Sequence, residues 1–336
     1  MAYTTIDDPE AYFQTVLYTG DTSAQSITLP GDTDLQPNMV WIKVRDASAY
    51  VVVQDSVRGV TGTDSYNIIT DAASTDVSDS ITALNSDGFT VGTDSNDRSN
   101  YDGQTHVAWC WKESATAGFD IVSYTGNGSA RTISHSLSAV PKMYIIKNLE
   151  EGDSWQVYHG SNTSAPETDF LQLNENGATT DSDARFNDTA PTSSVFSVGD
   201  HVTVNKNTIP YIAYLFADKQ GYSKTFSYEG NGETSGTFVY LGFRPAWLMV
   251  KPIDAADNWV NFDNKRLGFN SSVSPYSLHA NKNFAETTDT GQLDFLSNGF
   301  KIRNSGNTVN RTSTFIGIAF AEAPFVNSKG VPGNAR

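Results

Sequence analysis

The feature of this sequence that most constrains its fold is one strand-like motif that occurs three times at equal spacing. The segments QPNMVWIKV, AVPKMYIIKN and RPAWLMVKP each contain a proline followed six residues later by a lysine. The prolines are Pro37, Pro141 and Pro245, and both intervals between them are 104 residues. A regular period of this kind predicts three copies of one structural unit.

Other landmarks keep nearly the same period and the same order. Upstream of the motif, three tyrosines lie 106 and 104 residues apart, namely Tyr18, Tyr124 and Tyr228. Downstream follow three phenylalanines and then three alanines: Phe89, Phe196, Phe300, Ala108, Ala213 and Ala319. The second and third copies also have a tryptophan eight residues after the lysine, Trp155 and Trp259, where the first copy has Val51. The triplication is therefore the most specific signal in the chain.

Within each copy, six or seven short strand patterns are separated by turn residues. FDIVSYTG alternates before a GNG turn, and MYIIK is a continuous apolar strand entered through a proline, which has no N–H to donate. Gly, Ser, Thr, Asn and Asp are abundant, as in turn-rich β proteins, and long helical periodicity is missing. The sequence therefore predicts an all-β fold of three tandem antiparallel β-sandwich, jelly-roll-like modules of about 105 residues.

The boundaries follow from the same landmarks. We expect residues 1–115 to form module 1 with an N-terminal arm, 116–220 module 2, 221–322 module 3 and 323–336 a C-terminal tail. A unit of this size can bury a core of its own. The short linkers KESATAG and DKQGYSK favour fixed docking of neighbouring modules.

Charge and composition exclude several classes of partner. The formal net charge is −16, so we expect neither nucleic acid nor an anionic membrane surface to bind the protein. No apolar run reaches 18 residues, which predicts no membrane insertion, and the first residues lack the pattern of a signal peptide. We therefore expect folding in a cytoplasm. The single cysteine, Cys110, excludes an intrachain disulfide and is expected to be a buried small hydrophobe.

The repeated polar and aromatic residues allow two interpretations. Lys43, Lys147 and Lys251 invite a functional reading, but a lysine that ends an apolar strand can lie along the core edge and reach water. The three tyrosines and the two tryptophans could stack against sugars, or they could be core residues. We favour the structural interpretation for both sets, because repetition inside one chain reports a shared fold.

No catalytic or metal-binding pattern is present. The five histidines, His106, His135, His159, His201 and His279, lack H-E-x-x-H spacing, and neither a G-x-S-x-G elbow nor a P-loop occurs. Asp181 and Asp183 alternate in an aspartate-rich segment but lack the glycine and distal glutamate of an EF-hand, so a solvated loop is expected. We predict that the protein is not an enzyme and has no catalytic, cofactor-binding or metal-binding residues, while its binding residues stay undefined.

The assembled pattern resembles a family of tripled repeat proteins of tailed phages, especially marine and cyanobacterial phages. The segments DIVSYTGNGSARTISHSLSAVPKMYIIKN, YEGNGETSGTFVYLGFRPAWLMVK and IAFAEAPFVNSKGVPGNAR carry the resemblance, which extends from about Tyr12 to Arg336. Members are described as tail-fibre or virion structural proteins. No catalytic residue is carried over, and the sequence has no coiled-coil or low-complexity stalk.

This resemblance implies a non-enzymatic virion protein, assembled in the host cytoplasm and exposed on the particle. Our first hypothesis is a tail-fibre or receptor-binding subunit in host attachment. It would be a homo-oligomer, with a trimer expected by analogy alone, that contacts other virion proteins and binds a host glycan or protein receptor through loop tips. A pseudo-threefold monomer on a threefold particle site is the alternative to an oligomer.

Two further hypotheses remain open. The second is a decoration or knob protein on the phage head. The third is a carbohydrate-binding or polysaccharide-degrading protein.

Overall fold

The structure is a computed structural model that describes residues 2–60, 68–69, 79–94, 97–266, 277–287 and 293–333. The fold is all-β, as the sequence predicts, and all ladders between its strands are antiparallel. The helices of the described residues are short: α1 (Asp183–Phe186), α2 (Val202–Asn205), α3 (Asn307–Asn310) and 3₁₀ turns at Pro9–Ala11 and Pro166–Thr168.

Three large sheets share one strand order. The first is β1 (Phe13–Thr19), β8 (Thr105–Trp111), β3 (Met39–Val44), β4 (Val52–Asp55) and β5 (Ile68–Ile69). The second is β9 (Phe119–Thr125), β16 (Pro210–Phe216), β11 (Met143–Asn148), β12 (Gln156–His159), β13 (Asp169–Gln172) and the added β14 (Thr180–Asp181). The third is β17 (Ser223–Glu229), β24 (Thr314–Pro324), β19 (Phe243–Pro252), β20 (Val260–Asp263) and β21 (Leu278–His279). We call residues 13–111, 119–216 and 223–324 repeats 1, 2 and 3.

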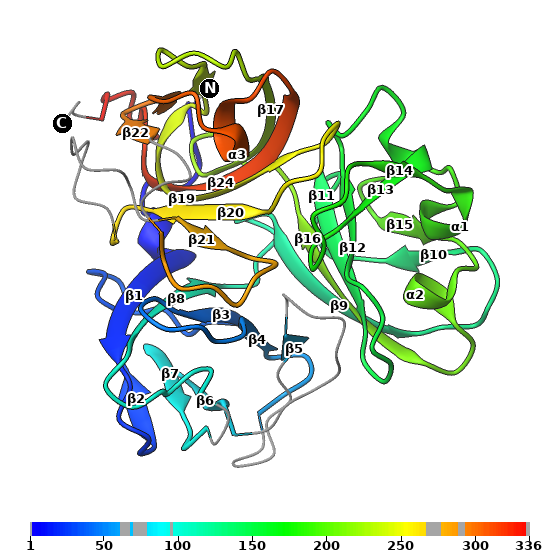
Figure 1. The fold of residues 1–336 in the computed structure, drawn as a ribbon. Coiled ribbons are helices and arrows are strands. Elements are labelled where there is room, and N and C mark those ends of the chain that lie inside the picture. Colours follow the sequence, from blue (N-terminus) through cyan, green and yellow to red (C-terminus); the bar gives the residue numbers. More distant parts are fainter. Residues whose placement is uncertain are drawn as a thin grey trace.

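A small sheet accompanies each large one. These sheets are β2 (Gln25–Ile27), β7 (Gly88–Val91) and β6 (Ile81–Asn85) in repeat 1, β10 (Arg131–Ser134) and β15 (Val195–Val198) in repeat 2, and β18 (Phe238–Tyr240), β23 (Gly299–Ile302) and β22 (Leu293–Leu296) in repeat 3. Figure 1 shows three lobes around a common centre, with β3, β11 and β20 turned inward and β6, β10 and β22 on the outside.

The central strand of each large sheet is buried on both faces. In β3, Met39 and Trp41 belong to a core shared by all three repeats, whereas Val40 and Ile42 belong to a core within repeat 1. Side chains alternate across a strand, so each face needs its own apolar set. This double burial explains why the motif reads as a continuous apolar run, a pattern typical of sheets covered on both sides.

The shared core is rich in aromatic rings. Trp247 packs with ring centroids 5.5 Å from Trp111, 6.1 Å from Trp109 and 5.9 Å from Phe320. A cavity of about 20 Å³ at this junction is lined by apolar and aromatic side chains from all three repeats. A space of this size holds no more than a water molecule, so the junction is packing rather than a ligand site.

The cores only partly match the expectation of separate modules. Repeats 1 and 2 each have a second cluster of their own between their large and small sheets. In repeat 3 the equivalent residues, such as Phe300 and Phe315, are continuous with the shared core. β24 also runs to Pro324, two residues past the expected end of module 3. The division into three modules therefore stays a prediction.

One of the three prolines departs from the expectation that each begins a strand. Pro37 and Pro141 stand two residues before β3 and β11. Pro245 instead lies inside β19, where the pairing with β24 shifts register on both sides of it. A bulge tolerates proline because the local ladder bond is already missing.

The shared core predicts a large effect of a single substitution. Trp247→Ala removes the ring at the junction and is expected to lower the free energy of unfolding by about 3–5 kcal/mol, measured by urea denaturation followed by tryptophan fluorescence. Phe284→Ala is the matched control, because that ring is exposed and its loss should change stability by less than about 0.5 kcal/mol. Equal effects of the two substitutions would contradict the role of the shared core.

Candidate functional site

The repeated tyrosines are structural. Each hydroxyl donates a hydrogen bond to a main-chain carbonyl near the end of its own repeat, and each ring stacks on a ring of the next strand. The bonds are Tyr18 to Ser99 O at 2.6 Å, Tyr124 to Val204 O at 2.6 Å and Tyr228 to Val309 O at 2.8 Å, and the stacked rings are those of His106, Tyr211 and Phe315. The tyrosines thus join each edge strand to the rest of its sandwich.

The repeated tryptophans cannot serve as sugar platforms. Trp155 is 1% exposed and Trp259 is 0% exposed. Their main-chain N–H groups donate to Asn174 Oδ1 at 2.9 Å and Asn281 Oδ1 at 3.1 Å, an arrangement that recurs in both repeats. Stacking against a sugar at these two positions is excluded because no ring face is accessible.

The repeated lysines are also structural, but the expectation that they reach water is wrong. Lys43, Lys147 and Lys251 are at most 1% exposed. Lys43 Nζ donates to Lys282 O in repeat 3 at 2.9 Å, and Lys251 Nζ donates to Asn176 O in repeat 2 at 3.4 Å. Burial lowers the pKa of Lys251 to about 8. Lys147 Nζ donates to Asp153 O within its own repeat. Because these lysines lie on the inward face of the central strand, their ammonium groups meet main-chain carbonyls instead of solvent, and those of Lys43 and Lys251 reach the neighbouring repeat.

A second set of polar contacts runs cyclically around the molecule. Tyr214 of repeat 2 donates to Asp55 Oδ2 of repeat 1 at 2.7 Å, and Trp109 Nε1 of repeat 1 donates to Asp263 Oδ2 of repeat 3 at 3.0 Å. His159 of repeat 2 completes the cycle, with its Nε2 3.0 Å from Gly317 O of repeat 3. Asp55, His159 and Asp263 occupy equivalent strand ends, so the same position of each repeat contacts a neighbouring repeat.

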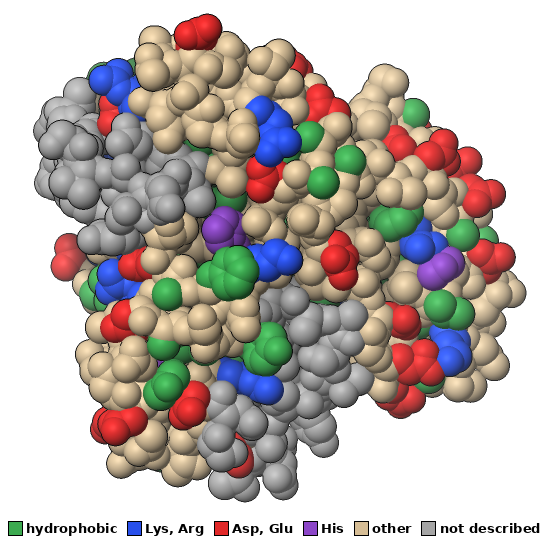
Figure 2. Space-filling model, in the orientation of Figure 1, with side chains coloured by type: hydrophobic (Ala, Val, Ile, Leu, Met, Phe, Trp, Pro, Cys, Tyr) green, Lys and Arg blue, Asp and Glu red, His purple; other side chains and the backbone are tan. Residues whose placement is uncertain are grey.

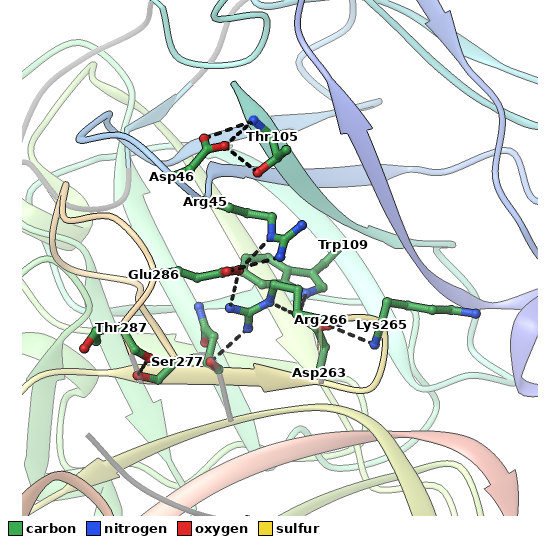
Figure 3. Close-up of polar contacts among 11 residues, drawn as sticks. Arg45, Asp46, Thr105, Trp109, Asp263, Lys265, Arg266, Ser277, Glu286 and Thr287 are labelled. Carbon is green, nitrogen blue, oxygen red and sulfur yellow. Dashed lines mark hydrogen bonds and ion pairs between the residues drawn. The ribbon is translucent and has the colours of Figure 1, made fainter. Parts of the chain in front are cut away.

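A cluster of charged side chains lies at the contact between repeats 1 and 3 (Figure 3). Arg45 Nε lies 2.6 Å from Glu286 Oε1, and Arg266 Nε lies 2.6 Å from Asp263 Oδ2. Arg266 Nη1 is also 3.7 Å from Glu286 Oε1, and the two arginines face two carboxylates. Buried charges that are paired and hydrogen-bonded in this way keep an interface in register, which indicates a structural role.

One carboxyl pair carries a strongly shifted pKa. Burial and a hydrogen bond with Asp120 raise the pKa of Glu113 to about 7. Main-chain N–H groups hold both carboxyls in place: Ile121 donates to Glu113 Oε1 and Ser136 donates to Asp120 Oδ2. The pair joins the end of β8 to the start of β9, and these local bonds account for its geometry without a substrate.

The other sequence candidates are scattered. Asp181 lies in β14 and is exposed, Asp183 begins α1, and Cys110 is buried as expected. In the part of the chain that the structure describes, no three His, Cys, Asp or Glu side chains come together to hold a metal ion.

A shallow groove lies at the mouth of the repeat 3 sandwich, between the edge strands β17 and β18. It encloses about 600 Å³ and is lined by Ser161, Lys224, Thr225, Phe226, Ser227, Tyr228, Glu229, Thr237, Phe238, Val239 and Tyr240. Two contacts cross it: Lys224 Nζ donates to Tyr240 O at 2.8 Å, and Thr237 Oγ1 donates to Glu229 O. The rings of Phe238 and Tyr240 are 43% and 49% exposed. We call this feature the β17–β18 groove.

Repeats 1 and 2 lack these rings. Strand register aligns Val239 with Ile27 and Ile133, so the position of Phe238 is held by Ser26 and Thr132. Longer side chains also cross the mouth there: Gln25 Nε2 donates to Thr19 O at 3.1 Å and Arg131 Nη2 donates to Thr125 O. Exposed aromatic rings at this edge are thus specific to repeat 3.

Comparison with known proteins identifies the family. A family model described as a domain of unknown function, DUF7483, matches residues 8–324. The chain belongs to the DUF7483 family. Neither the curated proteins nor the solved structures contain a match to it.

The surface of this DUF7483 protein is acidic. Figure 2 shows Asp and Glu side chains over all three lobes of the visible face, with Lys and Arg side chains as smaller groups among them. Together with the net charge of −16, this disfavours polyanionic ligands. None of the helices in the described residues has the length and apolar character needed to cross a membrane.

Three buried asparagines of this DUF7483 protein, which the sequence motifs above do not include, hold a turn in place within each repeat. Asn100, Asn205 and Asn310 are fully buried and spaced by 105 residues. Each side chain accepts from a main-chain N–H in the turn after the first strand and donates to two carbonyls; Asn205 accepts from Asn127 N at 3.0 Å and donates to Ser129 O and Gly199 O at 2.6 and 2.8 Å. Their spacing was the available signal.

Removal of one such asparagine should therefore be costly. Asn205→Ala leaves one N–H and two carbonyls without their partner and is expected to destabilise the protein by about 3 kcal/mol in urea unfolding. The exposed neighbour Asn207→Ala is the control, with an expected change within about 0.5 kcal/mol. A loss below about 1 kcal/mol for Asn205→Ala would show that the turn is held by other contacts.

His159 gives the contact between repeats 2 and 3 a pH dependence. Its Nδ1 accepts from Ser161 N at 3.2 Å, so the ring proton lies on Nε2 and is donated to Gly317 O. Burial lowers the pKa of His159 to about 4 in the folded protein, against 6.5 for the exposed side chain. The unfolded chain therefore binds the proton first, and the stabilising contribution is complete above pH 6.5 and is lost as the pH falls towards 4.

This sign can be tested by comparing wild type with His159→Gln, which keeps a donor at a similar position without a titrating group. Between pH 7 and pH 5 the wild type should lose about 2 kcal/mol more unfolding free energy than the variant. The measurement is urea denaturation at both pH values. Parallel pH profiles for the two proteins would show that His159 is not buried in the neutral form.

Proposed function

We propose that this protein is a non-enzymatic structural subunit of a tailed-phage particle, exposed on the particle surface as a tail-fibre or receptor-binding protein in host attachment. The observation that carries the proposal is the closed arrangement of the three repeats. Side chains that could take part in catalysis, including Lys43, His159 and Asp263, form contacts between repeats instead. Such a rigid body suits a scaffold that presents a surface.

The resemblance to tailed-phage repeat proteins supports the setting, and the acidic surface supports a protein exposed to solvent. The cyclic contacts also bear on the oligomer. One chain already has three equivalent large sheets around a centre, so a single copy can match a threefold axis of a particle (Figure 1). We therefore propose two alternative assemblies, a homotrimer or a single copy on a threefold site of the particle. In both, other virion proteins are the partners.

The capsid decoration protein is the second candidate, because a compact body without a shaft also suits attachment to a shell. The chain shows three lobes around one centre and no extended stalk within the described residues (Figure 1).

Immunogold labelling of intact particles of the phage that encodes the protein tests the proposal. We expect label at the tail or its fibres, and particles treated with antibody to this protein should adsorb to host cells at least tenfold more slowly. Label only over the capsid shell would favour the decoration protein. Absence of label from purified particles, with the protein found only in infected cells, would reject the virion role.

A further inference from the structure

The β17–β18 groove combines features that the equivalent edges of repeats 1 and 2 do not have. Two aromatic rings, Phe238 and Tyr240, are about half exposed at one rim. The opposite wall provides the exposed side chains of Ser227 and Glu229. A surface with rings on one side and hydrogen-bonding groups on the other suits a ligand that is itself apolar on its ring faces and polar at its edges.

The rim is held in place before any ligand binds. The Tyr240 hydroxyl is 3.2 Å from the Tyr3 hydroxyl, and Lys224 Nζ lies 5.4 Å from the centre of the Tyr240 ring. Thr314 Oγ1 donates to Glu229 Oε1 at 2.8 Å, which orients that carboxylate. Groups fixed in this way lose little conformational entropy on binding.

Charge narrows the class of ligand. The groove contains one acidic and one basic side chain, Glu229 and Lys224, with Lys224 Nζ bonded to Tyr240 O, and the whole protein carries a net charge of −16. The net charge of the protein repels an anionic ligand, and an apolar protein surface would bury the exposed polar side chains of Ser227 and Glu229 against groups that cannot hydrogen-bond to them, which costs free energy. A neutral molecule rich in hydroxyl groups meets neither penalty.

We propose that the β17–β18 groove binds a neutral oligosaccharide, with Phe238 and Tyr240 packing against a sugar ring and Ser227 and Glu229 hydrogen-bonding to its hydroxyl groups. This assignment gives the proposed attachment function a ligand class and rests on that function for its biological meaning. Its physical basis is the β17–β18 groove, in which the residues proposed to contact the ligand all belong to repeat 3. The loop tips at the GNG turns are not needed for it.

The test is affinity gel electrophoresis of the full chain through gels that contain dextran, hydroxyethyl cellulose, galactomannan or, as the anionic probe, alginate. We expect retardation by at least one neutral polysaccharide and none by alginate. Phe238→Thr, which introduces the residue that repeat 2 has at this position, should weaken that retardation about tenfold or more. Adding Tyr240→Ser should abolish it.

Leu17→Thr is the control, because it removes an exposed apolar side chain from β1, the strand of repeat 1 that corresponds to β17, and should leave retardation unchanged. Unchanged urea midpoints for Phe238→Thr and the control show that the fold is intact. Retardation by alginate alone, equal retardation of wild type and Phe238→Thr, or no retardation in any neutral gel would overturn the assignment.

Self-association is the competing outcome. If sedimentation shows a wild-type dimer that Phe238→Thr converts to monomer, and no neutral polysaccharide retards the protein, the rings cover a second copy and the assignment fails. The particle-labelling experiment is separate from these gels. If no neutral polysaccharide retards the protein but the particles are labelled, only the ligand class is rejected. If a neutral polysaccharide retards the protein but the particles carry no label, only the virion role is rejected.

Discussion

The rest of the structure depends on the burial of the inner faces of three large sheets against one another. Trp247 and Phe320 of repeat 3 meet Trp111 of repeat 1 and Phe216 of repeat 2 within ring-centroid distances of about 6 Å. A sheet with one exposed apolar face is a liability in water, and three such faces satisfy each other when they close around a centre. The closed arrangement therefore replaces three independent sandwiches by one body with a common core.

Polar contacts then set the register of that apolar packing. Asp55, His159 and Asp263 stand at equivalent strand ends, and each reaches the next repeat in a cycle. In the contact between repeats 2 and 3, His159 stands where the other two repeats have an aspartate. Its partner is a main-chain carbonyl, to which a neutral imidazole can donate and a carboxylate cannot. The same geometric position thus tolerates different chemistry, provided that the donor and the acceptor still match.

The division between scaffold and candidate site follows from this arrangement. Residues that repeat at the same position in all three copies, such as Tyr18 and Lys43 with their equivalents, hold main-chain groups and are buried or partly buried. The residues that make the β17–β18 groove distinctive are those that do not repeat: Phe238 and Tyr240 stand where the other copies have small polar residues. Differences between copies are therefore a better guide to binding than similarities.

The sequence by itself determined the all-β class, the position of the central strand in each copy and the burial of Cys110, because periodicity and turn residues act locally. It could also have revealed Asn100 and its two equivalents through their spacing. Only the tertiary structure decided that the copies share one core, that Lys43 and Lys251 bind carbonyls of neighbouring repeats, and that Trp155 and Trp259 have no accessible face. Those outcomes depend on which face of each sheet meets another repeat, and a strand pattern that is apolar on both faces looks the same whether the second face packs inside its own sandwich or against a neighbour.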